Sequence, residues 1–172
     1  VAPTHYRSGP SGVVQTLSQS GGDRTISKNF VDWKRNDGFY IDLNPTFDID
    51  PVGGNSPGER IFLAVRLIFG TLIFTSNVPN AGGACIPGGH SFQYNLDFKT
   101  GGYVGNDATA PAGKYITEFL VGAAIEQTSD LSRKALNKSI TGENLTTPIA
   151  VDRAFQAKRF SEAGSSARSA ST

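Results

Sequence analysis

The stretch from Gly70 to Val104 constrains the fold most strongly, because it reads as strand, glycine-rich loop, strand and turn. Its first part, Thr71–Thr75, is a run of β-branched and aromatic residues that is typical of a buried strand. We expect Asn77–Asn80 to end that strand, since its proline has no N–H to offer a sheet ladder. Four glycines and a proline in Ala81–Gly89 then predict a long loop.

The second strand of this stretch is marked by alternation. Residues 92–99 switch between apolar and polar side chains, which predicts a half-buried strand with one apolar face. Asp97–Gly102 closes it as a glycine turn. Short strands joined by turns also suit a composition of 20 Gly, 9 Pro and 11 Phe among 172 residues, with only 18% charged residues. We therefore expect an all-β or mainly β chain with antiparallel sheets, long Gly/Pro-rich loops and at most one short helix.

Weaker patterns place further elements around this centre. Strands are expected at Val13–Leu17, Phe39–Leu43, Lys114–Gln127 and Thr147–Val151, although a helix is an alternative for the third of these. Asp37-Gly38, directly before the second of them, is a type I′ hairpin-turn signal. Ser129–Lys138 has apolar residues at helical spacing behind a capping serine or aspartate, which predicts a short helix.

The segment Glu59–Phe69 is nearly continuous apolar surface. Such a run is typical of a strand that is buried on both faces. A chain of this size can bury it only if something covers both sides, so a central core strand and a subunit interface are equally good interpretations. The interface hypothesis rests on Phe62, Val65, Leu67 and Phe69.

Charge and hydropathy exclude some classes of partner. The 16 basic and 15 acidic residues nearly cancel, so nothing favours binding to nucleic acid or to an anionic membrane. The longest apolar run, Ile61–Phe74, is interrupted by Arg66 and Gly70 and is shorter than the ~20 residues that a membrane-spanning helix needs. We expect no membrane span.

Reactive side chains are sparse. The two histidines are His5 and His90, and Ser91 beside His90 should point to the opposite face of a strand, so no nucleophile and base are brought together. Cys85 is the only cysteine, which rules out an internal disulfide and makes a zinc site improbable. We expect no enzyme activity, no metal and no cofactor, with calcium binding by the oxygen-rich segment Asp48–Glu59 as an open alternative.

Several motifs of the central stretch, in this order and spacing, resemble the C-terminal β-propeller domain of the PilY/PilC family of type IV pilus-associated proteins. They are GTLIFTSNVPN from Gly70, then the lone cysteine, then GGHSFQYNLDFKTGG from Gly88. The resemblance extends upstream through the segment around Val31–Leu43 and covers about residues 24–121. The motif positions that we expect to be structural are Trp33, Asn77, Pro79, Asn80, Cys85, Gly88, Gly89, Asp97 and Gly101.

The resemblance implies sheets arranged like propeller blades, or a small sandwich, in an extracellular or cell-surface protein of a bacterium. Family members usually carry a polar break within the segment that corresponds to Glu59–Phe69, and this chain does not. Trp33 is open to two interpretations: a core or rim anchor, which we favour, or a stacking platform for a glycan or a partner.

The length of the chain limits its architecture. We expect one β domain over residues 13–160, with an N-terminal arm at 1–12 and a flexible tail at 161–172. A closed propeller has at least four blades, and this chain can supply about two. The lack of any methionine also suggests a processed chain or a fragment.

Open strand edges attract further strands, which leads to two functional hypotheses. The first is a non-enzymatic structural or adhesive protein that joins copies of itself, or pilus proteins, by β-strand contacts, and it could form a filament. The second is a glycan- or calcium-binding adhesin module.

Overall fold

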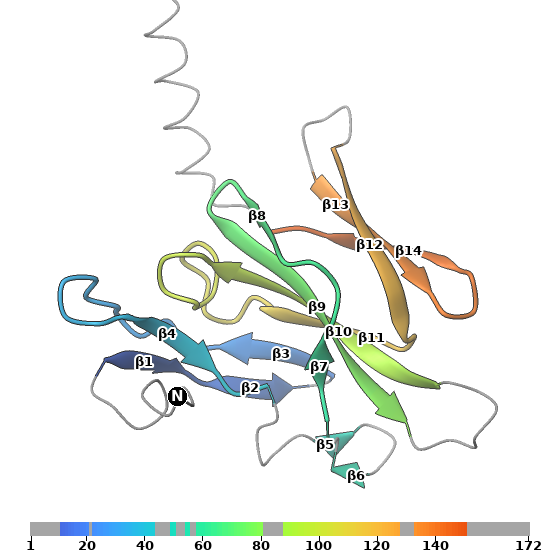
Figure 1. Ribbon diagram of the computed structural model, residues 1–172, viewed down its shortest axis with the longest axis horizontal. Coiled ribbons are helices and arrows are strands. Elements are labelled where there is room, and N and C mark those ends of the chain that lie inside the picture. Colours follow the sequence, from blue (N-terminus) through green and yellow to red (C-terminus); the bar gives the residue numbers. More distant parts are fainter. Residues whose placement is uncertain are drawn as a thin grey trace, which may run out of the picture.

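The computed structural model describes residues 11–20, 22–43, 49–50, 54–55, 58–80, 88–127 and 133–150. Every regular element in these ranges is a β-strand, and antiparallel pairs predominate (Figure 1). The predicted all-β class with antiparallel sheets is therefore confirmed.

The strands form four sheets. The largest has seven strands in the order β2 (Leu17–Ser20), β3 (Asp23–Ile26), β11 (Gly113–Ile116), β10 (Gly88–Asp97), β9 (Thr71–Asn80) and β7 (Arg60–Ile61), with β8 (Arg66–Ile68) also paired to β9. A second sheet holds three strands in the order β12 (Leu120–Gln127), β13 (Arg133–Ser139) and β14 (Asn144–Pro148). Two small pairs remain, β1 (Gly12–Gln15) with β4 (Gly38–Ile41) and β5 (Ile49–Asp50) with β6 (Gly54–Asn55).

The hairpin of β9 and β10 is the centre of the fold. Each strand has ten residues, and the register runs from Asn80 opposite Gly88 to Thr71 opposite Asp97. The predicted end of the first strand at Asn77–Asn80 is therefore wrong. Pro79 is tolerated because it is exposed and lies beyond Asn77, the last residue of β9 that pairs with β7.

The prediction of a half-buried second strand is also wrong, since β10 is buried on both faces from His90 to Leu96. Phe92, Tyr94 and Leu96 belong to a hydrophobic core on one face. On the other face, Gln93 accepts hydrogen bonds from side chains of the three-stranded sheet. The polar face of β10 is thus covered by a second layer of protein, and the alternating pattern cannot distinguish such a layer from solvent.

Two local predictions fail for related reasons. Asp37-Gly38 does not form a hairpin turn, because β4, which begins at Gly38, pairs in parallel with β1. The helix predicted at Ser129–Lys138 is replaced by β13 from Arg133 onward, with alternate side chains buried against the central sheet. Residues 128–132 lie outside the described part. Lys114–Gln127 does contain strands, β11 and β12, as preferred from the sequence.

The apolar segment Glu59–Phe69 is neither continuous nor central. It forms β7 and β8, both paired with β9, and residues 62–65 break the ladder between them. Ile61–Leu67 is largely exposed, so the interpretation as a core strand buried on both faces is overturned. Cys85 and the predicted tail at 161–172 lie outside the described residues. Most of the predicted arm at 1–12 and most of the oxygen-rich segment Asp48–Glu59 lie outside them too, although the side chain of Glu59 is described.

Candidate functional site

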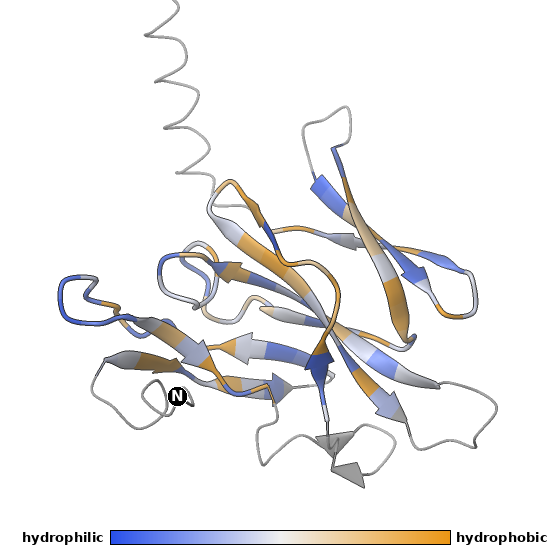
Figure 2. Cartoon of the chain, in the orientation of Figure 1, coloured by the Kyte–Doolittle hydropathy of each residue, from blue (hydrophilic) through white to orange (hydrophobic). Residues whose placement is uncertain are grey.

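The most unusual surface of the described chain is the apolar segment between β7 and β8. Ile61, Phe62, Val65 and Leu67 are between 42% and 58% exposed. Figure 2 shows the loop between the two strands as a hydrophobic band at the edge of the large sheet. We call these four residues the edge patch. A cluster of large apolar side chains in water is unfavourable unless something covers it.

Three of the four residues predicted for an interface belong to this patch, and Phe69 does not. The Phe69 ring lies under the guanidinium of Arg133, whose Cζ is 3.9 Å from the ring centroid. Phe69 also adopts a left-handed backbone conformation, with φ of 43°, in the turn before β9. Its role is therefore internal, because it joins the β8–β9 turn to the start of β13.

The patch continues onto the three-stranded sheet. The rings of Phe62 and Phe119 stack with their centroids 5.8 Å apart. Val121, in the edge strand β12, is itself exposed. The apolar surface thus spans two sheets that are separate in the hydrogen-bond ladder.

A groove lies where these two sheets approach one another. Arg66, Leu67 and Ile68 of β8 form one wall, and Ala124 and Ile125 of β12 form the other. In the described chain each wall pairs on one side only, β8 with β9 and β12 with β13 (Figure 1). Among the described residues both walls are therefore edge strands, whose outer backbone N–H and C=O groups pair with no described strand.

The groove leads inward to a pocket between the layers, whose lining includes Thr75, Gln93, Ala135 and Asn137. The side chains of Gln93 and Asn137 are joined by a hydrogen bond of 2.9 Å and are almost fully buried. Gln93 Nε2 and Asn137 Oδ1 nevertheless find no hydrogen-bond partner among the described residues. One donor and one acceptor without a described partner thus lie in the interior between the layers, and leaving such groups unpaired there costs about 1–3 kcal/mol each.

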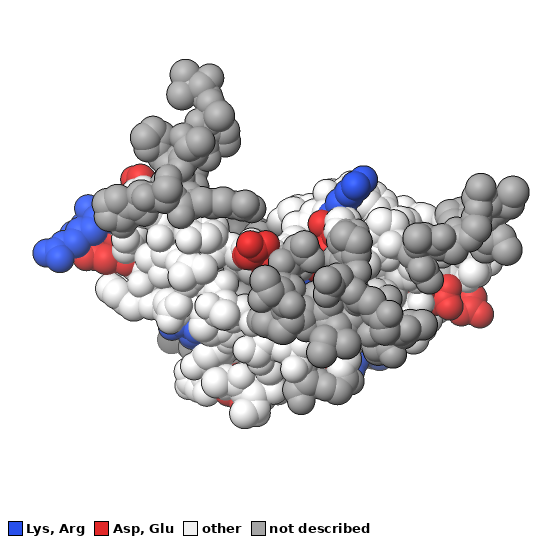
Figure 3. Space-filling view, turned by 90° about the horizontal axis from the view of Figure 1, so that it is seen from below, with Lys and Arg blue, Asp and Glu red and all other residues white. Residues whose placement is uncertain are grey.

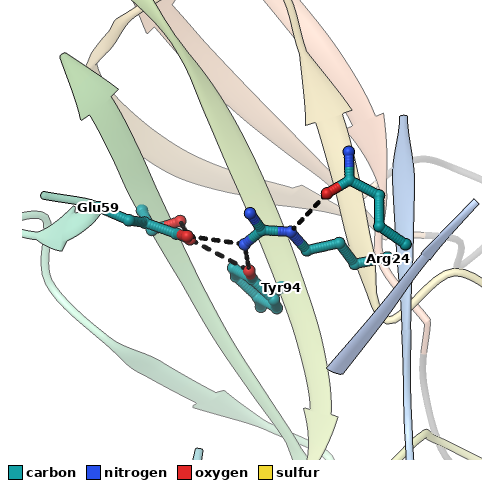
Figure 4. Close-up of polar contacts among 5 residues, drawn as sticks. Arg24, Glu59 and Tyr94 are labelled. Atoms are coloured by element: carbon teal, nitrogen blue, oxygen red, sulfur yellow. Dashed lines mark hydrogen bonds and ion pairs between the residues drawn. The ribbon is translucent and has the colours of Figure 1, made fainter. Parts of the chain in front are cut away.

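On the other face of the central sheet, buried polar groups bind one another. Arg24 of β3 and Glu59, just before β7, form an ion pair of 2.7 Å between side chains that are both 0% exposed (Figure 4). Tyr94 of β10 accepts a hydrogen bond from the Arg24 guanidinium and donates one of 3.1 Å to the Glu59 carboxylate. Ser76 donates a further hydrogen bond to Glu59, and the guanidinium lies 3.7 Å from the ring centroid of Phe92.

The environment of this network shifts its pKa values in one direction. Burial raises the pKa of the Glu59 carboxyl above its ordinary value, although the charge of Arg24 and the hydrogen bonds to Ser76, Arg24 and Tyr94 oppose the shift. Burial likewise raises the pKa of the Tyr94 hydroxyl, and the neighbouring Glu59 carboxylate adds to that shift. Tyr94 is therefore a neutral phenol. Because solvent does not reach these groups, we assign the network the structural role of joining β3, β10 and the chain that enters β7.

The residues considered for chemistry from the sequence are kept apart. Ser91 donates to Asn77 and to the carbonyl of Glu118, toward the three-stranded sheet. The His90 ring packs against Phe92 and Tyr115 on the opposite face. The described residues hold no group of three side chains that could bind a metal ion. Glu59, the described member of the proposed calcium loop, is already engaged by Arg24.

The motif residues predicted from the sequence lie in different structural settings. Asp97 accepts hydrogen bonds from the backbone N–H groups of Lys99 and Thr100, and its own carbonyl accepts one from Gly101, so the predicted glycine turn is present. Gly88 and Gly89 begin β10, and Asn80 ends β9. Trp33 is 57% exposed in a turn after β3, so it is not in the core, and a rim anchor and a stacking platform stay as the two interpretations.

Asn77 is the motif residue that joins the two layers. Its Nδ2 donates to the carbonyl of Leu120 over 2.8 Å, and its Oδ1 accepts from Ser91. The backbone N–H of Leu120 in turn donates to Ser91 Oγ. This small network fixes the start of β12 against the central hairpin, and so it positions the second wall of the groove.

Sequence reasoning missed the groove and the buried ion pair. The sequence offered Glu59 as a calcium ligand, Tyr94 as an apolar-face residue and the β12 segment as one more strand. Nothing in a linear pattern pairs Arg24 with a carboxylate 35 residues away. The signal that was available is the contrast between the apolar run Ile61–Phe69 and the single arginine within it, Arg66, which now lies in the groove wall.

No family model matches the chain, and no curated protein or solved structure is significantly similar to it. The relationship to the PilY/PilC family therefore stays a prediction. None of the described residues belongs to a helix that could span a membrane.

Proposed function

We propose that this protein is a non-enzymatic structural protein that joins copies of itself through β-strand contacts at the edge patch. One observation carries this proposal: four large apolar side chains are 42–58% exposed beside open strand edges. Covering the exposed half of a side chain of this size contributes about half of the ~1.5–3 kcal/mol for its full burial, and edge strands offer backbone hydrogen bonds to a neighbour. The geometry provides hydrophobic and hydrogen-bonding surface in the same place.

The charge distribution supports self-association. The net charge is +1, so two copies repel each other only weakly. On the face seen in Figure 3, the described surface is largely uncharged, and basic and acidic residues lie close together at its left end. Attraction between copies must therefore come mainly from apolar and backbone contacts.

The resemblance to pilus-associated proteins supports a bacterial cell surface or pilus as the place of action. Pilus proteins are then the alternative partners for the same surface. A partner that presents a free strand edge would use the same contacts as a second copy.

The test is the mass in solution by light scattering, with negative-stain images of the same samples. Wild-type protein is expected to form oligomers or polymers, and Val65→Lys and Leu67→Lys should each reduce the particle to the 18.2 kDa chain. Ala108→Lys, in an exposed loop, is the matched control and should assemble as the wild type does. Circular dichroism must show the same β-sheet signal in all three variants. A uniform wild-type monomer at all concentrations would overturn the proposal.

A second candidate function is favoured by one observation, the exposure of Trp33. An exposed indole can stack on a sugar ring or on a partner, as the adhesin-module hypothesis requires. Tyr103, another candidate for stacking, is less suitable because the Lys28 ammonium lies 4.9 Å from its ring centroid. Glycan-array binding that is lost in Trp33→Ala, with folding retained, would support this candidate. The absence of glycan binding by the wild type would remove it.

A further inference from the structure

The groove between β8 and β12 has the form of a site for an extended strand. Both walls are edge strands, and Ile68 and Ile125 contribute apolar surface between them. An inserted strand would hydrogen-bond to one wall through its backbone and place alternate side chains against the apolar surface of the groove.

The described part of the chain ends near this groove. Ile149 is 7% exposed and belongs to a buried cluster with Ile73 and Ala135, against which Ile68 and Ile125 also pack. The last described residues, Ile149 and Ala150, are followed by 22 more, residues 151–172. The end of the described chain thus belongs to a buried cluster against which two residues that line the groove also pack.

The first part of that segment fits the groove chemically. In an extended Val151–Phe155, Val151 and Phe155 share one face with Arg153, and Asp152 and Ala154 share the other. The groove wall offers the cation of Arg66, and Glu126 follows Ile125 on β12. Five extended residues span about 16 Å, which is enough to run past the three residues of β8.

We infer that the groove of one copy binds Val151–Phe155 of a second copy as an added β-strand. This inference rests on the proposed function and gives it a mechanism, because each copy would offer a groove to one neighbour and a strand to the other. Such head-to-tail contacts are heterologous, and they produce an open filament when the rotation between copies does not close a ring.

The experiment uses full-length chains and a short bismaleimide cross-linker. One chain carries Cys85→Ser with Ala124→Cys in the groove, and the other carries Cys85→Ser with Ala154→Cys in the donated segment. Mixing the two should give a cross-linked heterodimer as the main product. The control replaces the groove cysteine with Ala108→Cys in the exposed loop, and there the yield of heterodimer should be at least tenfold lower.

A second full-length variant tests the donated segment. Val151→Asp with Phe155→Asp should weaken association by about 100-fold or more, since two buried apolar side chains are lost. Its thermal midpoint, measured at a dilution where the wild type is monomeric, should be unchanged.

The outcomes separate this inference from the proposed function. Assembly that is lost in Leu67→Lys but persists in the Val151 and Phe155 variant, without a groove cross-link, would overturn the inference and leave edge-patch assembly standing. A chain carrying both cysteines that cross-links only within itself would show that the segment fills its own groove, and this would also overturn the inference. A wild-type chain that never assembles would overturn both.

Discussion

The two faces of the β9–β10 hairpin differ in whether their polar groups are paired and whether their apolar side chains are covered. Around Arg24, charged groups are fully buried and paired, and the apolar rings of β10 are covered. Around Leu67, apolar side chains are exposed, strand edges are open, and two buried amides have unpaired atoms. A closed region, whose charged groups are paired and whose apolar side chains are covered within one chain, contributes to folding. An open region, with exposed apolar side chains and free strand edges, offers contacts to a partner. Substitutions in the first region should therefore mainly change the stability of the fold, and those in the second mainly change association.

Breaking the buried ion pair should have the largest effect on stability. Glu59→Ala leaves the Arg24 guanidinium buried without its counter-charge, which should lower the free energy of unfolding by about 3–5 kcal/mol. Urea unfolding followed by circular dichroism measures the change. The double variant Arg24→Met with Glu59→Leu should recover much of the loss, because it removes both charges together. A loss below about 1 kcal/mol in Glu59→Ala would mean that this face is not the closed region described here.

The glycine turn after β10 should show the next largest effect. Gly101 has φ of 72°, and a Cβ there would lie 2.1 Å from the Phe39 ring. Gly105 is a matched control, since its φ is 74° and nothing lies within 4 Å of a Cβ. Both alanine variants carry the cost of a left-handed residue, about 1–2 kcal/mol, but Gly101→Ala must also displace an aromatic ring, which brings its cost to about 2–4 kcal/mol. Equal thermal shifts for the two variants would contradict the packing.

The Glu59 carboxyl should also leave a signature in the pH dependence of stability. Because burial raises its folded-state pKa, the folded chain binds a proton there more readily than the unfolded chain does. This contribution is fully present below the ordinary value of 4.5 and is lost as the pH rises through the folded-state pKa. The free energy of unfolding of the wild type minus that of Glu59→Gln should therefore fall as the pH rises from 4.5. A difference that rises over this range would reverse the assigned direction of the shift.

Urea titrations between pH 4 and pH 8 provide this measurement. Glu143→Gln, in the exposed turn before β14, reports the effect of removing one surface carboxylate. Comparing the two variants isolates what burial adds at Glu59.

The closed region was easier to anticipate from the sequence than the open one. The alternation of Phe92, Tyr94 and Leu96 correctly predicted one buried face, because side-chain direction along a strand depends only on local geometry. The turn at Asp97–Gly102 was predictable for the same reason. The cover on the other face of β10 comes from β13, where Asn137 lies 44 residues beyond Gln93, and no local pattern carries that information.

The open region was half predicted. The apolar run identified Phe62, Val65 and Leu67 as surface that needs a cover, but its division into β7 and β8 depends on where β9 offers pairing partners. The second wall of the groove was missed because β12 reaches it through Asn77 and Leu120, a tertiary contact. For Trp33 the sequence could not decide between core and rim, because its exposure depends on its position in the turn after β3.

The smallest effect on stability is expected at the edge patch itself. Phe62→Ala removes a stacking contact with Phe119 from a ring that is already half exposed, so it should lower the free energy of unfolding by only about 0.5–1.5 kcal/mol. Phe92→Ala, which empties a fully buried site on the closed side, should cost about 3–5 kcal/mol. The order should reverse for association measured by light scattering on folded protein, where Phe62→Ala weakens assembly and a folded Phe92 variant does not. If Phe62→Ala destabilises the chain as much as Phe92→Ala does, the edge patch is part of the core and the two faces do not differ in kind.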